Sequence, residues 1–240
     1  FGVEHKERIK EISKNVDVLT LTATPIPRTL QMSLLGIRNL SQLQTPPSSR
    51  MPIQTYVTEY NPHLAKEVIC RELSRGGQVF YLYNLFSTIF QKAEQIKKAI
   101  PNARVGVVHA KMDSEDIDKI MTEFYLGNID VLVCTSIVES GLDVPNANTI
   151  LIENSDKFGL SQLYQIKGRV GRSNRVAYAY LFYNKNKELT LEAEKRLKAI
   201  KEFASLGSGY KIAEKDLSIR GAGDILGSQQ SGFIDSVGID

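Results

Sequence analysis

The sequence predicts an α/β fold, with a doubly wound parallel sheet that carries helices on both faces and is followed by a C-terminal helical hairpin. Two observations predict it. Continuous apolar segments alternate with amphipathic segments of helical period between residues 53 and 183, a pattern typical of parallel strands buried on both faces. Beyond residue 185 the strand pattern stops, and helical periodicity with frequent glycines follows. At 240 residues the chain is long enough to bury such a core.

The composition narrows the function classes without selecting one. Hydrophobic residues make up 42% and charged residues 24% of the chain, and a net charge of +3 permits a nucleic-acid partner without arguing for one. No apolar run approaches the length of a membrane span and residues 1–10 lack a signal-peptide apolar region, so no membrane partner is predicted. Cys70 and Cys134 lie in apolar patterns without CxxC spacing, which predicts core thiols in a reducing cytosol, and the scattered histidines support no metal site.

The first part of the chain is predicted to end one structural lobe. Residues 16–21 (VDVLTL) have the pattern of a buried strand, and Thr22 and Thr24 follow in TATPIPRTL, where two prolines forbid its continuation. Hydroxyls at the carboxyl end of such a strand either point into a ligand crevice or form a capped turn. Residues 45–52 (TPPSSRMP) disfavour both helix and central strand, and we interpret them as a linker between two lobes.

The elements of the second lobe are bounded by local signals. An edge strand near 53–57 precedes a helix that Asn61 caps, that has Pro62 at its first position and that Gly76 and Gly77 end. The remaining predicted elements are, in order, a strand at 79–83, a helix from 89 to 100 stopped by Pro101, a strand at 105–109, a Ser114-capped helix closed by Gly127, and strands at 131–135, 149–153 and 178–183.

Polar residues follow three of these strands. Asn84, His109 with Lys111, and Thr135 come directly after apolar runs, and function in parallel sheets gathers at the carboxyl ends of strands. A threonine hydroxyl beside backbone N–H groups at a helix N-terminus suits a nucleic-acid phosphate. His109 is otherwise a satisfied strand-end histidine, and Lys111 a solvated surface charge.

The loop after Thr135 has the sequence TSIVESGLDVP. Its Glu139, Gly141 and Asp143 either shape a surface that faces a neighbouring domain or are ordinary turn residues, since Gly, Asp and Pro favour turns in any case.

The segment QLYQIKGRVGR, residues 162–172, places Gln165, Gly168, Arg169, Gly171 and Arg172 in the order QxxGRxGR. Two arginines that each follow a glycine suit a short helix at a domain edge, where the glycines let another body approach closely. Guanidinium matches phosphate bidentately and stays charged, so the pair can act as arginine fingers on a transferring phosphoryl group. The alternative is a solvated basic helix end.

The last block, from residue 185 to 240, is predicted to be a helical hairpin. Thr190 can cap a helix whose Ala193, Leu197 and Ile200 share one face. The glycines after residue 206 are too frequent for one uninterrupted helix, so two short helices joined by tight turns fit this block and dock on the sheet domain. Its basic residues either follow a nucleic-acid backbone or face solvent.

Taken together, these segments resemble the superfamily 2 helicases and translocases. TAT at 22–24 is similar to motif III, TSIVESGLDVP to motif V and QIKGRVGR to motif VI. The continuations GRVGRSNRVAYAYL, AEKRLKAIKEF and IAEKDLSIRGAGDILGSQQSGFIDSVG resemble the branch that couples transcription to repair, with the RecG helicases as close relatives. The resemblance implies a RecA-like fold in which residues 1–46 end the first lobe, 47–184 form the second lobe and 185–240 form a translocation-motif hairpin.

The resemblance also implies roles for individual residues. Arg169 and Arg172 would contact the γ-phosphate of ATP, and Gln165 would sense the nucleotide. The cleft between the lobes would be lined by Glu139, Gly141 and Asp143. DNA would be contacted by Thr135, Asn84, His109 and Lys111. The resemblance further implies coupling of hydrolysis to movement by Thr22, Thr24, Arg196, Arg220 and Gln230.

The implied function is that of an ATP-dependent double-stranded DNA translocase that releases stalled RNA polymerase and couples transcription to nucleotide excision repair in the cytoplasm. The alternatives are a RecG-like branched-DNA helicase and a non-catalytic nucleic-acid-binding module. A metabolic α/β enzyme is disfavoured because the chain has neither a GxGxxG turn nor a nucleophile elbow.

The sequence departs from the family pattern in several places. It contains no GxxxxGK[ST] loop and no acidic magnesium-binding box, so we expect a fragment that hydrolyses essentially no ATP alone. ATP and Mg²⁺ would be held mainly by a first lobe. RNA polymerase and repair proteins would bind through other segments. Lys167 stands where the family usually has arginine, HAKM replaces HGQM, and Asn84 is followed by apolar Leu85 and Phe86.

Overall fold

The computed structural model describes residues 52–135, 143–184, 188–202 and 209–220, and a few isolated positions before residue 42. Within these ranges six strands form one sheet in the order β1-β6-β5-β2-β4-β3, and every strand pair is parallel. The strands are β1 (Ile53–Glu59), β2 (Gln78–Leu82), β3 (Val105–Val108), β4 (Val131–Cys134), β5 (Ala147–Ile152) and β6 (Ala177–Tyr183). The helices are α3 (Pro62–Ser74), α4 (Ile89–Ala99), α5 (Ser114–Tyr125), α6 (Leu160–Lys167), α7 (Leu191–Glu202) and α8 (Gly209–Arg220), with short 3-10 turns η1 (Phe86–Thr88) and η2 (Ser155–Lys157).

Side-chain caps mark the starts of two helices, α3 and α7. The Asn61 side chain accepts hydrogen bonds from the backbone N–H groups of His63 and Leu64, as predicted for the cap of α3. The Thr190 hydroxyl accepts from the N–H of Ala193 at 3.2 Å and caps α7. The predicted cap of α5 was placed one residue late, because the extended residue before the helix is Asp113 and Ser114 is already helical.

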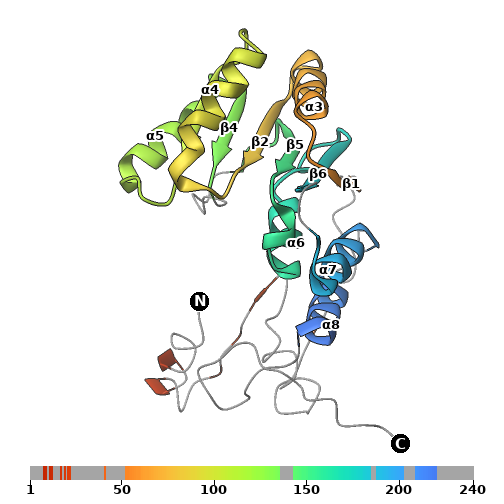
Figure 1. The fold of residues 1–240 in the computed structure, drawn as a ribbon. Helices are drawn as coiled ribbons and strands as arrows, with labels where there is room; N and C mark the ends of the chain where they lie inside the picture. Colours follow the sequence, from red (N-terminus) through yellow and green to blue (C-terminus); the bar gives the residue numbers. More distant parts are fainter. Residues whose placement is uncertain are drawn as a thin grey trace, which may run out of the picture.

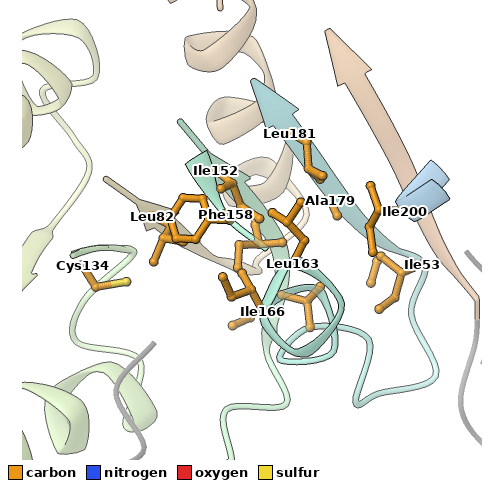
Figure 2. Packing of buried hydrophobic residues seen from close by; sticks show 14 of the residues in the cluster. Ile53, Leu82, Cys134, Ile152, Phe158, Leu163, Ile166, Ala179, Leu181 and Ile200 are labelled. Carbon is orange, nitrogen blue, oxygen red and sulfur yellow. The ribbon is translucent and has the colours of Figure 1, made fainter. Parts of the chain in front are cut away.

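The sheet is buried on both faces, and each face has its own core (Figure 1). Helices α3 and α4 cover one face through side chains such as Ile69, Ile89 and Ile96, which pack against Tyr81 and Phe182. Helices α5, α6, α7 and α8 cover the other face. Figure 2 shows part of that second core, in which Leu163 and Ile166 of α6 lie against Ile152 and Ala179, and Ile200 of α7 lies near Ile53. This arrangement is the doubly wound architecture that the sequence predicts.

The helical hairpin packs on the sheet domain through α6. Helices α7 and α8 contact each other and both contact α6, and they are grouped together in Figure 1. The Ser161 hydroxyl, in the first turn of α6, donates to the buried Asp216 carboxylate of α8 at 3.3 Å. Helices α7 and α8 therefore pack side by side, whereas residues 221–240, which hold most of the glycines of the predicted hairpin, lie outside the described residues.

The predicted strand at 16–21 is wrong where it can be checked. Asp17, Leu19 and Leu21 belong to no strand, and Leu19 and Leu21 are exposed. An apolar run becomes a strand only when neighbouring strands satisfy its backbone groups, and no strand of the described ranges pairs with these residues. The predicted linker lies outside the described residues except for Pro52. None of the described helices is both long and apolar enough to cross a membrane.

The central strand β4 gives a direct test of the core. We expect Leu132→Ala to lower the free energy of unfolding by about 2–5 kcal/mol, because Leu132 is fully buried and the truncation leaves a cavity. Leu126→Ala is the matched control: that leucine is 61% exposed, so its truncation should change stability by about 0.5 kcal/mol or less. Urea unfolding followed by circular dichroism measures both, and equal effects would contradict the assigned core.

Candidate nucleotide and nucleic-acid sites

The arginine-bearing segment lies at the amino edge of the sheet, where β1 and β6 begin. Helix α6 follows the carboxyl end of β5 and runs back along the sheet, and the turn after it reaches the amino ends of the neighbouring strands. A β-carbon at Gly171 would come within 3.0 Å of Ile53 and 3.3 Å of Ala177, and this residue has a φ of +75°. Both facts require glycine. This segment therefore lies at the edge opposite to the one that carries Asn84, His109 and Thr135.

Arg172 forms a solvent-exposed ion pair with Asp143. Its Nη1 lies 2.7 Å from Asp143 Oδ1, and its Nε donates to the Gly168 carbonyl at 3.4 Å. The two side chains remain 31% and 51% exposed, so the pair is open to solvent. The structure thus brings together two of the predicted site residues, 29 positions apart in the chain.

The other motif VI residues flank this pair. Arg169 is half-buried in the turn after α6, and Gln165 is exposed on the last turn of the helix. The helix ends at Lys167, with Gly168 as its cap, so both arginines follow the helix rather than lie within it. Glu139 and Gly141 lie outside the described residues.

Lys167 is buried between these residues. Its side chain is almost fully inaccessible, and the ammonium lies 5.6 Å from the centre of the Tyr164 ring. Burial lowers the pKa of Lys167 from its ordinary value of 10.5 to about 8. Lys167 is therefore buried, in contrast to the partly exposed Arg172 that follows it.

A second set of charged residues holds the arginine turn in place, and the sequence analysis did not single it out. Arg75 pairs with the buried Glu72 and donates to the Val176 carbonyl at 2.8 Å, while Arg175 donates to the Arg75 carbonyl. Glu72 also accepts from the hydroxyl of Thr149 at 2.7 Å. Arg175 follows the motif closely enough to be noticed as basic, but nothing in the sequence marks Glu72 as buried.

The predicted DNA-binding residues meet at the opposite, carboxyl edge. The Thr135 hydroxyl accepts from the N–H of Ala110 at 3.3 Å, which ties the end of β4 to the loop after β3. His109 and Asn84 are half-buried there, and His109 Nδ1 and Asn84 Oδ1 are buried atoms that make no hydrogen bond in the part of the chain described. The structure therefore gathers Thr135, His109 and Lys111 as predicted, with Asn84 at the end of the adjacent strand β2.

Aromatic side chains frame this edge, and no motif in the sequence marks them. His109 makes edge-to-face contacts with Phe86 and Phe90, with ring centres 4.9 and 5.7 Å apart. The Lys111 ammonium lies 4.1 Å from the centre of the Phe86 ring, a cation–π contact. Glu115 and Asp116, in the first turn of α5, add negative charge nearby in sequence.

A buried polar network supports the same edge from the α4 face. Lys92 of α4 lies 2.7 Å from Glu153, at the end of β5, and Tyr81 donates a short hydrogen bond to the same carboxylate. Burial lowers the pKa of Lys92, but the hydrogen bond and charge of Glu153 outweigh it, so the net pKa is raised. Burial, followed by the Glu153 charge, raises the pKa of Tyr81 well above its usual range.

The predicted coupling residues are only partly described. Arg196 of α7 donates to the backbone carbonyl of Asp156 in η2 at 3.4 Å, which joins the hairpin to the loop before α6. Arg220 ends α8, and Thr22 is exposed. Thr24 and Gln230 lie outside the described residues.

A family match and two solved structures first indicate the class of protein. Residues 62–174 match the family described as helicase conserved C-terminal domain. The solved structure of RecG bound to a three-way DNA junction is 36% identical with a TM-score of 0.71, covering 86% of this chain and 27% of that chain. Saccharomyces cerevisiae Dbp5 bound to RNA and ADP BeF3 shares the fold alone, at 16% identity and a TM-score of 0.51, over 84% of this chain and 46% of that one. Residues 62–174 therefore have the RecA-like fold of a helicase C-terminal domain.

The curated relatives give a narrower likeness. Over all 240 residues the chain is 61% identical to the transcription-repair-coupling factor of Bacillus subtilis strain 168 and 60% identical to that of Staphylococcus haemolyticus strain JCSC1435. The chain is thus a close relative of the transcription-repair-coupling factors over its whole length, as the motif resemblance predicted. The match covers 100% of this chain but only 20% of each of these proteins, so the chain spans about a fifth of their length.

The buried Lys167 predicts a defined pH dependence. Because its folded pKa of about 8 is below the ordinary 10.5, the unfolded chain binds more protons between these values, and stability contributed at this site rises with pH across that window. We expect Lys167→Met to abolish this rise and to be more stable than wild type at pH 7, with a gap that shrinks by about 3 kcal/mol toward pH 10.5. Urea unfolding at several pH values measures it.

The matched control for this prediction is Lys119→Met, since the side chain of Lys119 is 73% exposed. Its stability curve should run parallel to that of wild type over the same pH range. A Lys167→Met curve that also ran parallel to wild type would contradict a charged-form penalty at Lys167.

Proposed function

We propose that this chain is the second RecA-like lobe and translocation hairpin of an ATP-dependent double-stranded DNA translocase that releases stalled RNA polymerase and couples transcription to excision repair. The observation that carries the proposal is the exposed Arg172–Asp143 pair beside Arg169 at the amino edge, in a chain 60% identical to transcription-repair-coupling factors. The proposed boundaries are 1–46 for the end of the first lobe, 47–184 for the second lobe and 185–240 for the hairpin.

The amino edge suits the terminal phosphate of ATP. Two guanidinium groups lie three residues apart on one turn, and a solvent-exposed ion pair is weak enough to exchange its carboxylate for a phosphate. ATP with Mg²⁺ supplies the phosphoryl group, held mainly by a first lobe. Arg169 and Arg172 neutralise charge on the γ-phosphate, Gln165 senses it, and Asp143 with Glu139 and Gly141 lines the cleft between lobes.

The carboxyl edge suits the DNA backbone. Thr135 and Lys111 provide a hydroxyl and an ammonium group for phosphates, with His109 and Asn84 beside them. Sites on opposite edges of one rigid sheet let lobe closure on ATP move the DNA contacts as a unit. Arg196, Arg220 and Gln230 of the hairpin, with Thr22 and Thr24 of the first lobe, transmit that movement.

A RecG-like branched-DNA helicase is the second candidate, and the structural likeness to RecG favours it. The two candidates differ in the activity expected of the full-length protein. A full-length protein that unwinds branched forks without displacing stalled RNA polymerase would be of the RecG type, whereas polymerase release supports the first proposal.

The arginine assignment is tested in the full-length protein. We expect Arg172→Ala to lower the rate of DNA-stimulated ATP hydrolysis by about 10³ to 10⁵, the range typical of arginine fingers, with DNA affinity unchanged. The control Arg104→Ala removes another exposed arginine that pairs with an aspartate, Asp130, and should keep full activity. The isolated chain serves as a blank that hydrolyses essentially no ATP. Undiminished turnover by Arg172→Ala would rule out the finger role.

The hairpin assignment is tested by separating hydrolysis from movement. In the full-length protein, Arg220→Ala should keep DNA-stimulated ATP hydrolysis but lose displacement of a DNA triplex, because the stepping element no longer receives the closure of the lobes. Loss of both activities would make Arg220 a folding or nucleotide-site residue. Retention of both would leave α8 with a packing role only.

A further inference from the structure

We propose that Arg75 and Arg175 are positioning residues, which hold Arg172 in place for ATP hydrolysis without touching the nucleotide themselves. The inference rests on the proposed role of Arg172 as an arginine finger and names the residues that act through it. A finger lowers the barrier only when its guanidinium stands where charge develops on the transferring phosphoryl group. Arg172 follows the end of α6, so contacts from other elements must fix its position.

The two positioning arginines exchange hydrogen bonds between the end of α3 and the segment that leads from Arg172 into β6. The Arg75 Nη2 donates to the Val176 carbonyl at 2.8 Å, and the Arg175 guanidinium donates in return to the Arg75 carbonyl. The Arg75 guanidinium also lies 5.1 Å from the centre of the Tyr178 ring, a cation–π contact. We call these two reciprocal bonds the arginine clasp. The clasp fastens the segment after Arg172 to a helix that lies about 100 residues earlier in the chain.

A buried carboxylate orients one half of the arginine clasp. Glu72 is 1% exposed, and its Oε2 accepts from Arg75 Nε at 2.8 Å and from the Thr149 hydroxyl of β5 at 2.7 Å. Burial of an unpaired carboxylate is costly, so Glu72 keeps the Arg75 guanidinium beside it. The planar guanidinium divides its donors between this carboxylate and the Val176 carbonyl. Arg75 is therefore oriented before a nucleotide binds.

Ser173 connects the arginine clasp to Arg172. Its hydroxyl donates to the side chain of Asn148, a fully buried residue of β5, at 3.0 Å, and accepts from the backbone N–H of Arg175 at 3.3 Å. Ser173 is the residue directly after Arg172. The backbone next to the finger is thus fixed to the sheet through Asn148 and to α3 through the clasp.

The test measures kcat and KM for DNA-stimulated ATP hydrolysis by the full-length protein. Arg75→Ala would leave the buried Glu72 carboxylate unpaired, so we choose Arg75→Lys, which keeps a cation there but loses the fork that also reaches Val176. We expect kcat to fall by about 10- to 100-fold, because a displacement of about 1 Å costs up to about 10² in rate. The KM for ATP should stay within about twofold of wild type. Arg175→Ala leaves the Glu72–Arg75 pair intact and should lower kcat in the same way.

The matched control is Arg104→Lys. Arg104 also pairs with a carboxylate, that of Asp130, and also donates to a backbone carbonyl, that of Gly127 at 2.7 Å, but these contacts join the loops beside β3 and β4. Its kcat should stay within about twofold of wild type. Urea unfolding checks that each variant is folded, and Arg175→Ala carries the test if Arg75→Lys is not.

Combination with Arg172→Ala decides whether Arg75 acts through the finger. Single-turnover hydrolysis of radiolabelled ATP measures the slow residual rate of Arg172→Ala. Arg75→Lys should lower that rate no further, because residues that act as one unit are not additive. A multiplicative loss in the double variant, or full kcat in the folded single variants, overturns the positioning role and leaves the finger assignment standing. Undiminished hydrolysis by Arg172→Ala overturns both.

Discussion

The parallel pairing of six strands is the constraint from which the placement of both sites follows. Parallel neighbours need a crossover of a dozen or more residues, so each strand ends at one edge and the next begins at the opposite edge. Residues directly after strands, such as Thr135 and His109, meet at the carboxyl edge. Residues after the returning helix α6, Arg169 and Arg172, meet at the amino edge. One sheet thus presents two chemically distinct edges that cannot move independently.

Helix α6 joins the amino edge to the helical hairpin. Its first turn is hydrogen-bonded to α8 through Ser161, the loop before it contacts α7 through Arg196, and the arginine turn follows its last residue. Eight helical residues span about 12 Å, and Leu163 and Ile166 fix this short rod in the core. One short helix thus connects the contacts with α7 and α8 to the arginine turn.

The sequence could predict what depends on local signals and could not predict what depends on distant contacts. Patterns within a few residues predict which segments are strands, the helix caps at Asn61 and Thr190, and the helices after residue 185. The edge on which the arginines lie depends on the direction of α6, and the strand at 16–21 depended on partners outside its own pattern. The burial of Glu72 and the Lys92–Glu153 pair arises from residues tens of positions apart.

The burial of each ion pair determines how readily its arginine could bind a phosphate instead. Arg75 pairs with Glu72, a carboxylate buried to 1% exposure, and breaking such a pair costs about 3–5 kcal/mol because a buried charge is left uncompensated. Arg172 and Asp143 are both well exposed, and a pair of that kind contributes about 1 kcal/mol or less. A charge-assisted, bidentate bond to phosphate is stronger than that. Exchange is therefore favourable at Arg172 and unfavourable at Arg75, although each arginine pairs with a carboxylate at the same edge of the sheet. In the proposed ATP site, the weak and exposed pair with Asp143 would orient the Arg172 guanidinium and exchange for a phosphate at little cost.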